Sequence, residues 1–180
     1  MSALNPELEP AGPDVPPSTP TPAQIVPTSF AGVDGPTFFL TPVSDEKESP
    51  AEQTIRSLLD QGWYVFGETT RGRKVIRAGD RICFYQSGVG VVASATLTSS
   101  VEKKPIRFVR NPDAYPWAFG VADVRYFFDA PIAIDAAMRS RLDAFRGRDP
   151  AKGWAWFVQG TRFGLTARDF ALLIGAANSE

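Results

Sequence analysis

Hydrophobic and polar residues alternate most regularly in the middle of the chain, across residues 62–100. Two runs there, residues 81–87 and 89–98, are separated by a turn with glycine at both ends. One side of the second run consists of Val89, Val91, Ala93, Ala95 and Leu97. A period of two is typical of a strand with one buried face. We therefore expect a β-hairpin, around which a small barrel closes.

A helical period follows Ser49. Ser49 and Glu52 form a capping box, and Pro50 between them suits the first helical turn. The hydrophobic side of this helix consists of Ala51, Ile55, Leu58 and Leu59. Gly62 is expected to end the helix.

Two more helices are predicted towards the C-terminus. The first starts after Asp135 and is closed by Gly147; its hydrophobic side carries Met138, Leu142 and Phe145. The second starts at Thr166, three positions before Asp169, and ends at Gly175. Its hydrophobic side consists of Phe170, Leu173 and Ile174.

The remaining segments complete an α+β pattern. We expect a short first strand at residues 37–40, a loop over 41–49, a polar connection over 101–114, and a final strand at 154–158 followed by a loop over 159–164. Residues 119–134 predict one long strand or two strands broken near residue 130. Strands and helices do not alternate regularly, which favours a small, mixed, mostly antiparallel barrel with peripheral helices.

The first 35 residues differ from the rest. They hold eight of the 16 prolines, four acidic residues and no Lys or Arg. Such a segment buries too little surface to offset its ordering entropy, so we expect a disordered acidic tail over 1–35 and a folded domain over 36–180. The tail could keep the protein in solution or recruit a partner protein.

Two absences narrow the chemistry. The chain has no His, which excludes Ser-His-Asp and Cys-His catalysis and every His-containing zinc site. Its single cysteine, Cys83, cannot form an internal disulfide, and no hydrophobic run approaches the ~20 residues of a membrane helix. We expect a soluble, cytoplasmic protein.

Basic residues exceed acidic ones from residue 36 onwards, at 19 to 16, and 14 of the 19 are Arg. This excess points weakly to an anionic partner. Residues 69–77, TTRGRKVIR, place four basic side chains around Gly72. Such a loop fits phosphate contacts, and it fits equally a solvated charged loop.

Five stretches resemble the EVE domain, a PUA-like barrel related to the YTH and ASCH domains. They are FFLTPVSDE, the Trp63 turn, GDRICFYQSGVGVVASATLTSS, FGVADVRYFFDAPIAID and FVQGTRFGLTARDFALLI, and together they cover residues 37–175. The chain departs from the EVE pattern in two places: Phe38 and Phe39 stand where the first strand of EVE proteins usually has Trp, and Gly67 and Glu68 replace an Arg-Asn pair after the helix.

The resemblance implies a non-catalytic module, without cofactor or metal, that binds a modified base of DNA or RNA and works alone or beside a nuclease or other effector. Trp63 would be the stacking wall. The implied base-binding residues are Thr41, Pro42, Ser44, Trp63, Tyr64, Tyr85, Ser87, Gln159 and Arg162. The implied phosphate-binding residues are Arg71, Arg73 and Lys74.

An enzyme is the competing hypothesis. ASCH-type relatives are similar in size and include amidohydrolases that act on modified nucleosides. Glu68, Thr69 and Lys74 would be the available polar groups. Because the chain has no His, a general base near neutral pH would need a strongly shifted carboxylate or lysine.

Overall fold

The hairpin expected from the alternating pattern forms the centre of a seven-stranded sheet. This computed structural model describes residues 35–45, 50–152 and 154–176. The expected tail lies outside these residues apart from Gly35. Strand order along the sheet is β2-β6-β4-β3-β1-β7, with β5 also paired to β6. The strands are β1 (Phe38–Val43), β2 (Trp63–Phe66), β3 (Arg81–Gln86), β4 (Gly90–Leu97), β5 (Glu102–Lys103), β6 (Trp117–Tyr126) and β7 (Arg162–Leu165).

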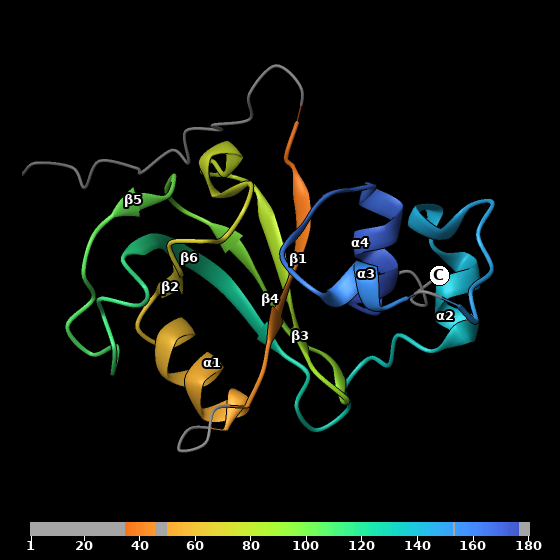
Figure 1. Ribbon diagram of the computed structural model, residues 1–180, viewed down its shortest axis with the longest axis horizontal. Coiled ribbons are helices and arrows are strands. Elements are labelled where there is room, and N and C mark those ends of the chain that lie inside the picture. The colour runs from red at the N-terminus through yellow and green to blue at the C-terminus, as the bar shows by residue number, and fades with distance from the viewer. Residues whose placement is uncertain (1–34, 46–49, 153, 177–180) are drawn as a thin grey trace, which may run out of the picture.

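Only β1 and β3 are parallel among the paired strands of the described residues, and the sheet curls into an open half-barrel (Figure 1). Helical segments lie at its edges. They are α1 (Ala51–Leu59), η1 (Arg73–Val75), α2 (Ala136–Arg141), η2 (Asp143–Phe145), α3 (Ala155–Val158) and α4 (Ala167–Leu173). The predicted fold class, a mixed and mostly antiparallel α+β half-barrel with peripheral helices, is confirmed.

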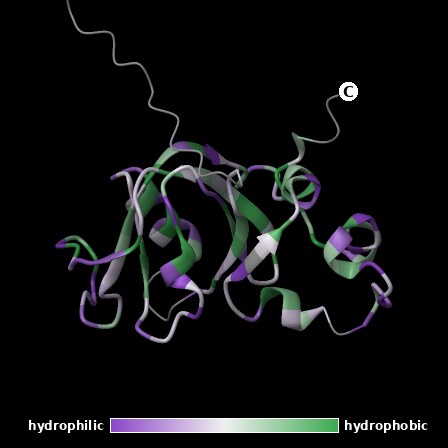
Figure 2. Cartoon of the chain, turned by 90° about the horizontal axis from the view of Figure 1, so that it is seen from above, coloured by the Kyte–Doolittle hydropathy of each residue, from purple (hydrophilic) through white to green (hydrophobic). Residues whose placement is uncertain are grey.

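Two hydrophobic cores lie on the two faces of β1 and β3. The barrel core contains Phe39, Ile82 and Phe84 on the concave side, together with the buried side of α1. The second core contains Leu40 and Cys83 from the same strands, together with side chains of the C-terminal helices. Adjacent residues of a strand point to opposite faces, so these two strands are shared by both cores. Seen from above, the curled strands and the helical region lie beside each other (Figure 2).

The predicted helix starts are confirmed, but the helix expected from Asp135 to Gly147 is broken: α2 ends at Arg141, Leu142 is extended, and the short η2 follows. The Asp135 and Thr166 side chains accept hydrogen bonds from the backbone N–H groups of Met138 and Asp169, at 2.7 and 3.0 Å. Ala51, Ile55, Leu58 and Leu59 are all buried. Ser49 lies outside the described residues. Pro50 is the N-cap residue of α1, and the Asp45 carboxylate accepts from Ala51 N at 2.7 Å.

One face assignment within the hairpin was wrong. The pairing shifts between Phe84 and Tyr85, whose partners are Ala93 and Val91, so Val92 is an extra residue on β4. This bulge turns Val91 towards the second core while Val92 and Ala93 face the barrel core. A single uninterrupted hydrophobic face across the second strand therefore does not exist.

The predicted last strand was also wrong. Residues 154–158 contain the short helix α3, in which Phe157 N donates to Trp154 O at 2.9 Å. Phe157 is fully buried in the second core, and tertiary packing of this ring overrides the β propensity of an aromatic run. The C-terminal strand is instead β7, which pairs antiparallel with β1 and falls mostly in the segment expected to be a loop. Strand β1 likewise continues through Thr41, Pro42 and Val43, where a loop was expected.

Within the residues that the structure describes, none of the helices combines the length and the hydrophobicity that crossing a bilayer requires.

Candidate functional site

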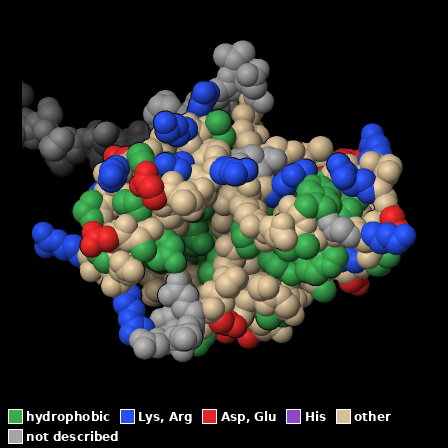
Figure 3. Space-filling model, in the orientation of Figure 1, with side chains coloured by type: hydrophobic (Ala, Val, Ile, Leu, Met, Phe, Trp, Pro, Cys, Tyr) green, Lys and Arg blue, Asp and Glu red, His purple; other side chains and the backbone are tan. Residues whose placement is uncertain are grey.

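The half-barrel stays open along a seam between β1 and β2. These strands lie towards opposite ends of the sheet order and do not pair, although α1 directly links them in sequence. Two clefts lie along this seam, a large cleft of about 580 Å³ and a small cleft of about 420 Å³. Pro42, Tyr64, Val65 and Tyr115 line both, so the two clefts adjoin. Figure 3 shows the hollow, with hydrophobic side chains in its floor and basic side chains along the upper edge of the same face.

Four aromatic side chains from three segments line the large cleft: Tyr64 and Phe66 of β2, Tyr115, and Trp156 of α3. Tyr64 and Phe66 are 7% and 4% exposed, as expected for core residues, and their rings pack on Phe84 and Phe119. Burial, together with the neighbouring Tyr115, raises the pKa of Tyr64 far above its usual value, so its phenol stays neutral. Tyr64 and Phe66 therefore give the cleft a flat, uncharged floor that is part of the barrel core.

Polar groups surround the mouth of the large cleft. The hydroxyl oxygens of Thr41 on β1 and Thr161 before β7 are 3.0 Å apart and share a hydrogen bond. Thr69, Thr70, Arg71, Gln159 and Arg162 complete this polar lining. Hydroxyl and amide groups can both donate and accept, and guanidinium groups only donate, so the mouth can match a mixed pattern of donors and acceptors on a ligand.

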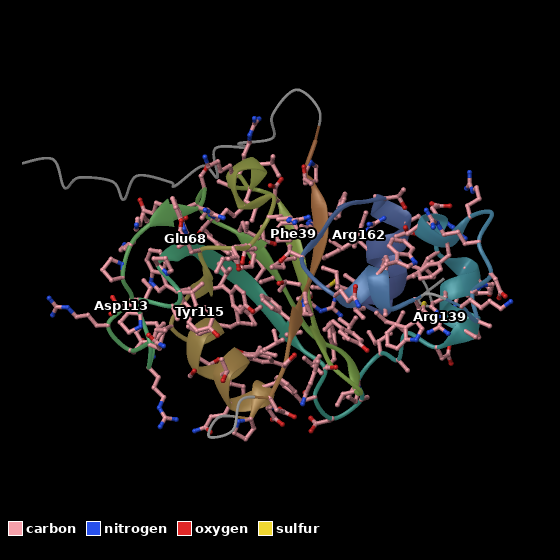
Figure 4. The ribbon with its side chains drawn as sticks, in the orientation of Figure 1. Phe39, Glu68, Asp113, Tyr115, Arg139 and Arg162 are labelled. Atoms are coloured by element: carbon pink, nitrogen blue, oxygen red, sulfur yellow. The ribbon has the colours of Figure 1, made fainter. Side chains whose placement is uncertain are left out.

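Hydrogen bonds of the Arg73 side chain hold the loop that carries Thr69, Thr70 and Arg71 in position. Arg73 Nη1 donates to the carbonyl of Thr70 at 2.8 Å, and its Nη2 lies 3.4 Å from Glu68 Oε1. Glu68 Oε2 in turn accepts from the indole N–H of Trp117 at 2.8 Å, and the Arg73 guanidinium lies 4.7 Å from the same ring. Arg73 is thus engaged inside the loop, which ties residues 67–73 to β6. In Figure 4, Glu68 is labelled on the left of the view and Arg162 on the right, beyond Phe39 of β1.

The structure brings half of the sequence-predicted site residues together. The large cleft is lined by Thr41, Pro42, Tyr64, Arg71, Gln159 and Arg162. Ser44 lines the small cleft with Pro42 and Tyr64. Lys74 is exposed, and neither it nor Arg73 lines either cleft.

Three other predicted residues lie elsewhere. Trp63 is half-buried, lines neither cleft, and carries the Lys104 ammonium 4.1 Å from its ring centroid. Tyr85 is buried in the second core, where its ring is 6.4 Å from that of Trp154. Ser87 is exposed in the hairpin turn. Their binding roles remain predictions, without support from the position of the clefts.

Trp156, Tyr115, Thr161 and Phe66 line the large cleft but were not among the predicted site residues. Trp156 was assigned to a strand, and only the helical turn of α3 turns its indole towards the cleft. Tyr115 follows the polar connection, where nothing in the pattern marks its ring as facing β2. A useful signal was present for Thr161, because it lies between the predicted Gln159 and Arg162.

Candidate chemistry for the competing enzyme hypothesis is arranged differently. Of Glu68, Thr69 and Lys74, only Thr69 lines the large cleft. The Glu68 carboxylate is held by Trp117 and Arg73. Among the described residues no group of three or more His, Cys, Asp or Glu side chains could hold a metal ion.

Comparison with known proteins gives a fold and no family. No family model matches the chain, and no curated protein matches it in sequence. Solved structures that are similar include a protein from Pseudomonas putida, with a TM-score of 0.50 and 16% identity, which covers 77% of this chain and 98% of that one. A protein from Pseudomonas syringae has a TM-score of 0.48 and 13% identity over 77% and 97% of the two chains.

A further structure is that of the YTH domain-containing protein mmi1 in complex with RNA, with a TM-score of 0.38 and 11% identity. The alignment covers 48% of this chain and 53% of the YTH chain, so this chain spans about half the length of that protein. The likeness to the Pseudomonas putida protein, which extends over nearly all of that chain, shows that the two share a fold.

Proposed function

We propose that this protein binds one modified nucleobase of DNA or RNA in the large cleft and carries out no chemistry on it. The observation that carries the proposal is the composition of the cleft: a flat aromatic wall rooted in the core and a rim of hydroxyl, amide and guanidinium groups. Its volume of about 580 Å³ falls within the range of roughly 300–1,000 Å³ typical of small-molecule sites. The resemblance of the sequence to EVE domains supports the same ligand class.

A base that leaves its stack needs three things from a protein: a stacking surface, polar groups for its edge, and cations for the flanking phosphates. We assign the stacking surface to Trp156 and Tyr115, which are half-buried and border the cleft. A base stacked on Trp156 takes the place of a guanidinium on that ring, since Arg162 and Arg148 lie over it in the unliganded protein. The polar edge contacts fall to Thr41, Thr161 and Gln159. Stacking on an aromatic ring contributes about 1–3 kcal/mol per base, and each matched hydrogen bond adds about 1 kcal/mol.

Binding without turnover fits the groups at the mouth. A general base would have to reach the ligand. Glu68 lies in the chain between Gly67 and Thr69, which line the cleft, but its carboxylate already accepts hydrogen bonds from Trp117 and Arg73. A nuclease or other effector acting beside the reader stays a prediction from the sequence resemblance.

The test is a binding panel with a variant that fills the cleft. Single-stranded and duplex DNA and RNA oligonucleotides with one modified base each, and their unmodified counterparts, are titrated by fluorescence anisotropy. Gly160 lines the cleft, and a Cβ added there has no atom within 4 Å, so Gly160→Phe adds bulk without a clash at the backbone. Ala137→Phe adds the same side chain to an exposed position of α2 that lines neither cleft, and it is the matched control.

We expect at least one modified oligonucleotide to bind tighter than its unmodified counterpart, Gly160→Phe to lose that preference, and Ala137→Phe to keep it. Chromatography of the nucleosides after incubation checks for turnover. Equal affinity for modified and unmodified strands across the panel would refute the reader function, and release of a product would replace it with the amidohydrolase.

A further inference from the structure

Two guanidinium groups lie over one indole ring beside the large cleft. The Cζ of Arg162, at the start of β7, is 4.3 Å from the ring centroid of Trp156, and the Cζ of Arg148, in the connection before α3, is 4.8 Å from it. Arg162 lines the cleft, whereas Arg148 is exposed and does not. The pair therefore leads from the cleft to the outer surface of the protein.

Each guanidinium is attracted electrostatically to the face of the indole ring. The two positive charges lie against the same ring, and they repel each other. Burial, and then the charge of Arg148, lower the pKa of Arg162 below its ordinary value. Within the part of the chain that the structure describes, neither guanidinium has a carboxylate partner. The two acidic residues nearest to Arg148 in sequence are engaged with other groups: Asp149 pairs with Lys152 and accepts from Ala151 N, and Asp143 pairs with Arg146 and Arg168.

The wider charge distribution points the same way. Residues 136–176 contain seven Lys and Arg residues and three Asp, a net charge of +4, whereas residues 36–135 hold 12 basic and 12 acidic residues. The basic excess of the domain is thus concentrated in the segment that carries Arg148 and Arg162. An anion bound by both guanidiniums would offset the local repulsion and the regional excess of positive charge.

We infer that Arg148 and Arg162 bind the backbone phosphate next to the base held in the large cleft, and this inference rests on the proposed function. Guanidinium groups match phosphate oxygens with two parallel donors, and such charge-assisted pairs are the stronger kind of hydrogen bond. The sequence had placed the phosphates on Arg71, Arg73 and Lys74. Arg73 is engaged with Thr70 and Glu68, and Lys74 lines neither cleft, so Arg71 is the one member of that set that lines the large cleft.

The test compares a strand with a free base. The best modified oligonucleotide of the panel, in separate DNA and RNA arms, and the corresponding free nucleoside are titrated against Arg148→Gln and Arg162→Gln over a series of salt concentrations. Lys152→Gln is the control, because Lys152 is an exposed cation of the same segment that pairs with Asp149 at 3.6 Å. Thermal unfolding of each variant verifies that it is folded.

We expect Arg148→Gln to weaken oligonucleotide binding by about tenfold at low salt and to reduce the magnitude of the salt slope by about 0.7, the value for one single-strand phosphate contact. The affinity for the free nucleoside should fall much less. Arg162→Gln should reduce the slope similarly, and Lys152→Gln should leave it unchanged.

The inference is overturned, with the reader function intact, if Arg148→Gln and Arg162→Gln keep the wild-type slope while Arg71→Gln and Lys74→Gln reduce it. It is also overturned if the wild type binds the free nucleoside as tightly as the strand. Failure of the wild type to bind any member of the panel overturns the proposed function itself.

Discussion

The barrel region (residues 36–135) and the C-terminal lobe (residues 136–176) are built differently, although β1 and β3 of the barrel region contribute side chains to the cores of both. The barrel region is balanced in charge and closes around one hydrophobic core, with Phe119 fully buried at its centre. The C-terminal lobe has a net charge of +4 and packs short helical segments around a second core that contains Phe157. The large cleft lies where they meet: β2 supplies its floor, and α3 with the segment before β7 supplies one wall. Neither region therefore forms the large cleft without the other.

The two cores should unfold in one cooperative transition if the strands β1 and β3, which contribute to both, couple them. Phe119→Ala and Phe157→Ala each remove a fully buried ring, one from each core, and each should cost about 3–5 kcal/mol of unfolding free energy. Because β1 and β3 contribute to both cores, urea unfolding followed by fluorescence and by circular dichroism should give one transition for each variant. Two separated transitions would show that the regions are independent.

Among the described residues, each region has a buried carboxylate that accepts hydrogen bonds from backbone N–H groups. Asp80 accepts from Thr37 N and Arg77 N at 2.9 and 2.8 Å, and Asp169 accepts from Asp143 N and Ala144 N at 2.6 and 3.0 Å. Replacing either by Ala leaves two N–H groups without their acceptor and should cost about 2 kcal/mol or more.

The carboxylate variants also separate the regions by function. Asp169→Ala should weaken base binding more than Asp80→Ala, because Asp169 orders the C-terminal lobe that carries Trp156 and Arg162. Asp149→Ala, at an exposed acceptor, is the control for denaturant unfolding. Equal binding by both buried-site variants would contradict the assignment of the cleft wall to the C-terminal lobe.

A smaller, pH-dependent effect is expected at Asp143 in the C-terminal lobe. The Thr166 hydroxyl, and then the guanidiniums of Arg168 and Arg146, hold the pKa of Asp143 below its ordinary value. A carboxyl group with a lowered pKa in the folded chain stabilises it above the unfolded value, about 3.9, and that contribution is lost as the pH falls through the folded value. Asp143→Asn should therefore be less stable than wild type near neutral pH.

The stability difference between Asp143→Asn and wild type should shrink as the pH is lowered from neutral towards and below the ordinary aspartate pKa. Urea unfolding at a series of pH values measures it, with Asp113→Asn, in the barrel region, as a comparison. A difference that is constant with pH would exclude the ionised carboxylate as its source.

Sequence patterns predicted the elements best where local chemistry decides them. The central hairpin, the hydrophobic side of α1 and the caps at Asp135 and Thr166 all depend on neighbours in the chain. The patterns failed at residues 154–158, because a run of aromatic residues suits a strand and only the packing of Phe157 in the second core makes it helical. The bulge at Val92 was invisible for the same reason, since pairing with two neighbouring strands sets it.

The candidate site was only half predictable. Thr41, Gln159 and Arg162 follow from the resemblance of their stretches to the EVE pattern, and all three line the large cleft. A cleft arises where segments distant in the chain face each other, so a turn rich in aromatic residues does not reveal which ring faces inwards. Trp63 and Tyr64 are neighbours in the chain, yet only Tyr64 lines the cleft.

The most direct test of the account compares two half-buried tryptophans, Trp156→Ala and Trp63→Ala, in binding the preferred modified oligonucleotide. Trp156→Phe, with thermal unfolding of all variants, separates loss of stacking from loss of packing against Phe145 and Phe157. If the cleft between the two regions holds the base, Trp156→Ala weakens binding about 5- to 100-fold, Trp156→Phe keeps most of the affinity, and Trp63→Ala stays within about twofold of wild type. A large loss for Trp63→Ala with an unchanged Trp156→Ala would contradict the account.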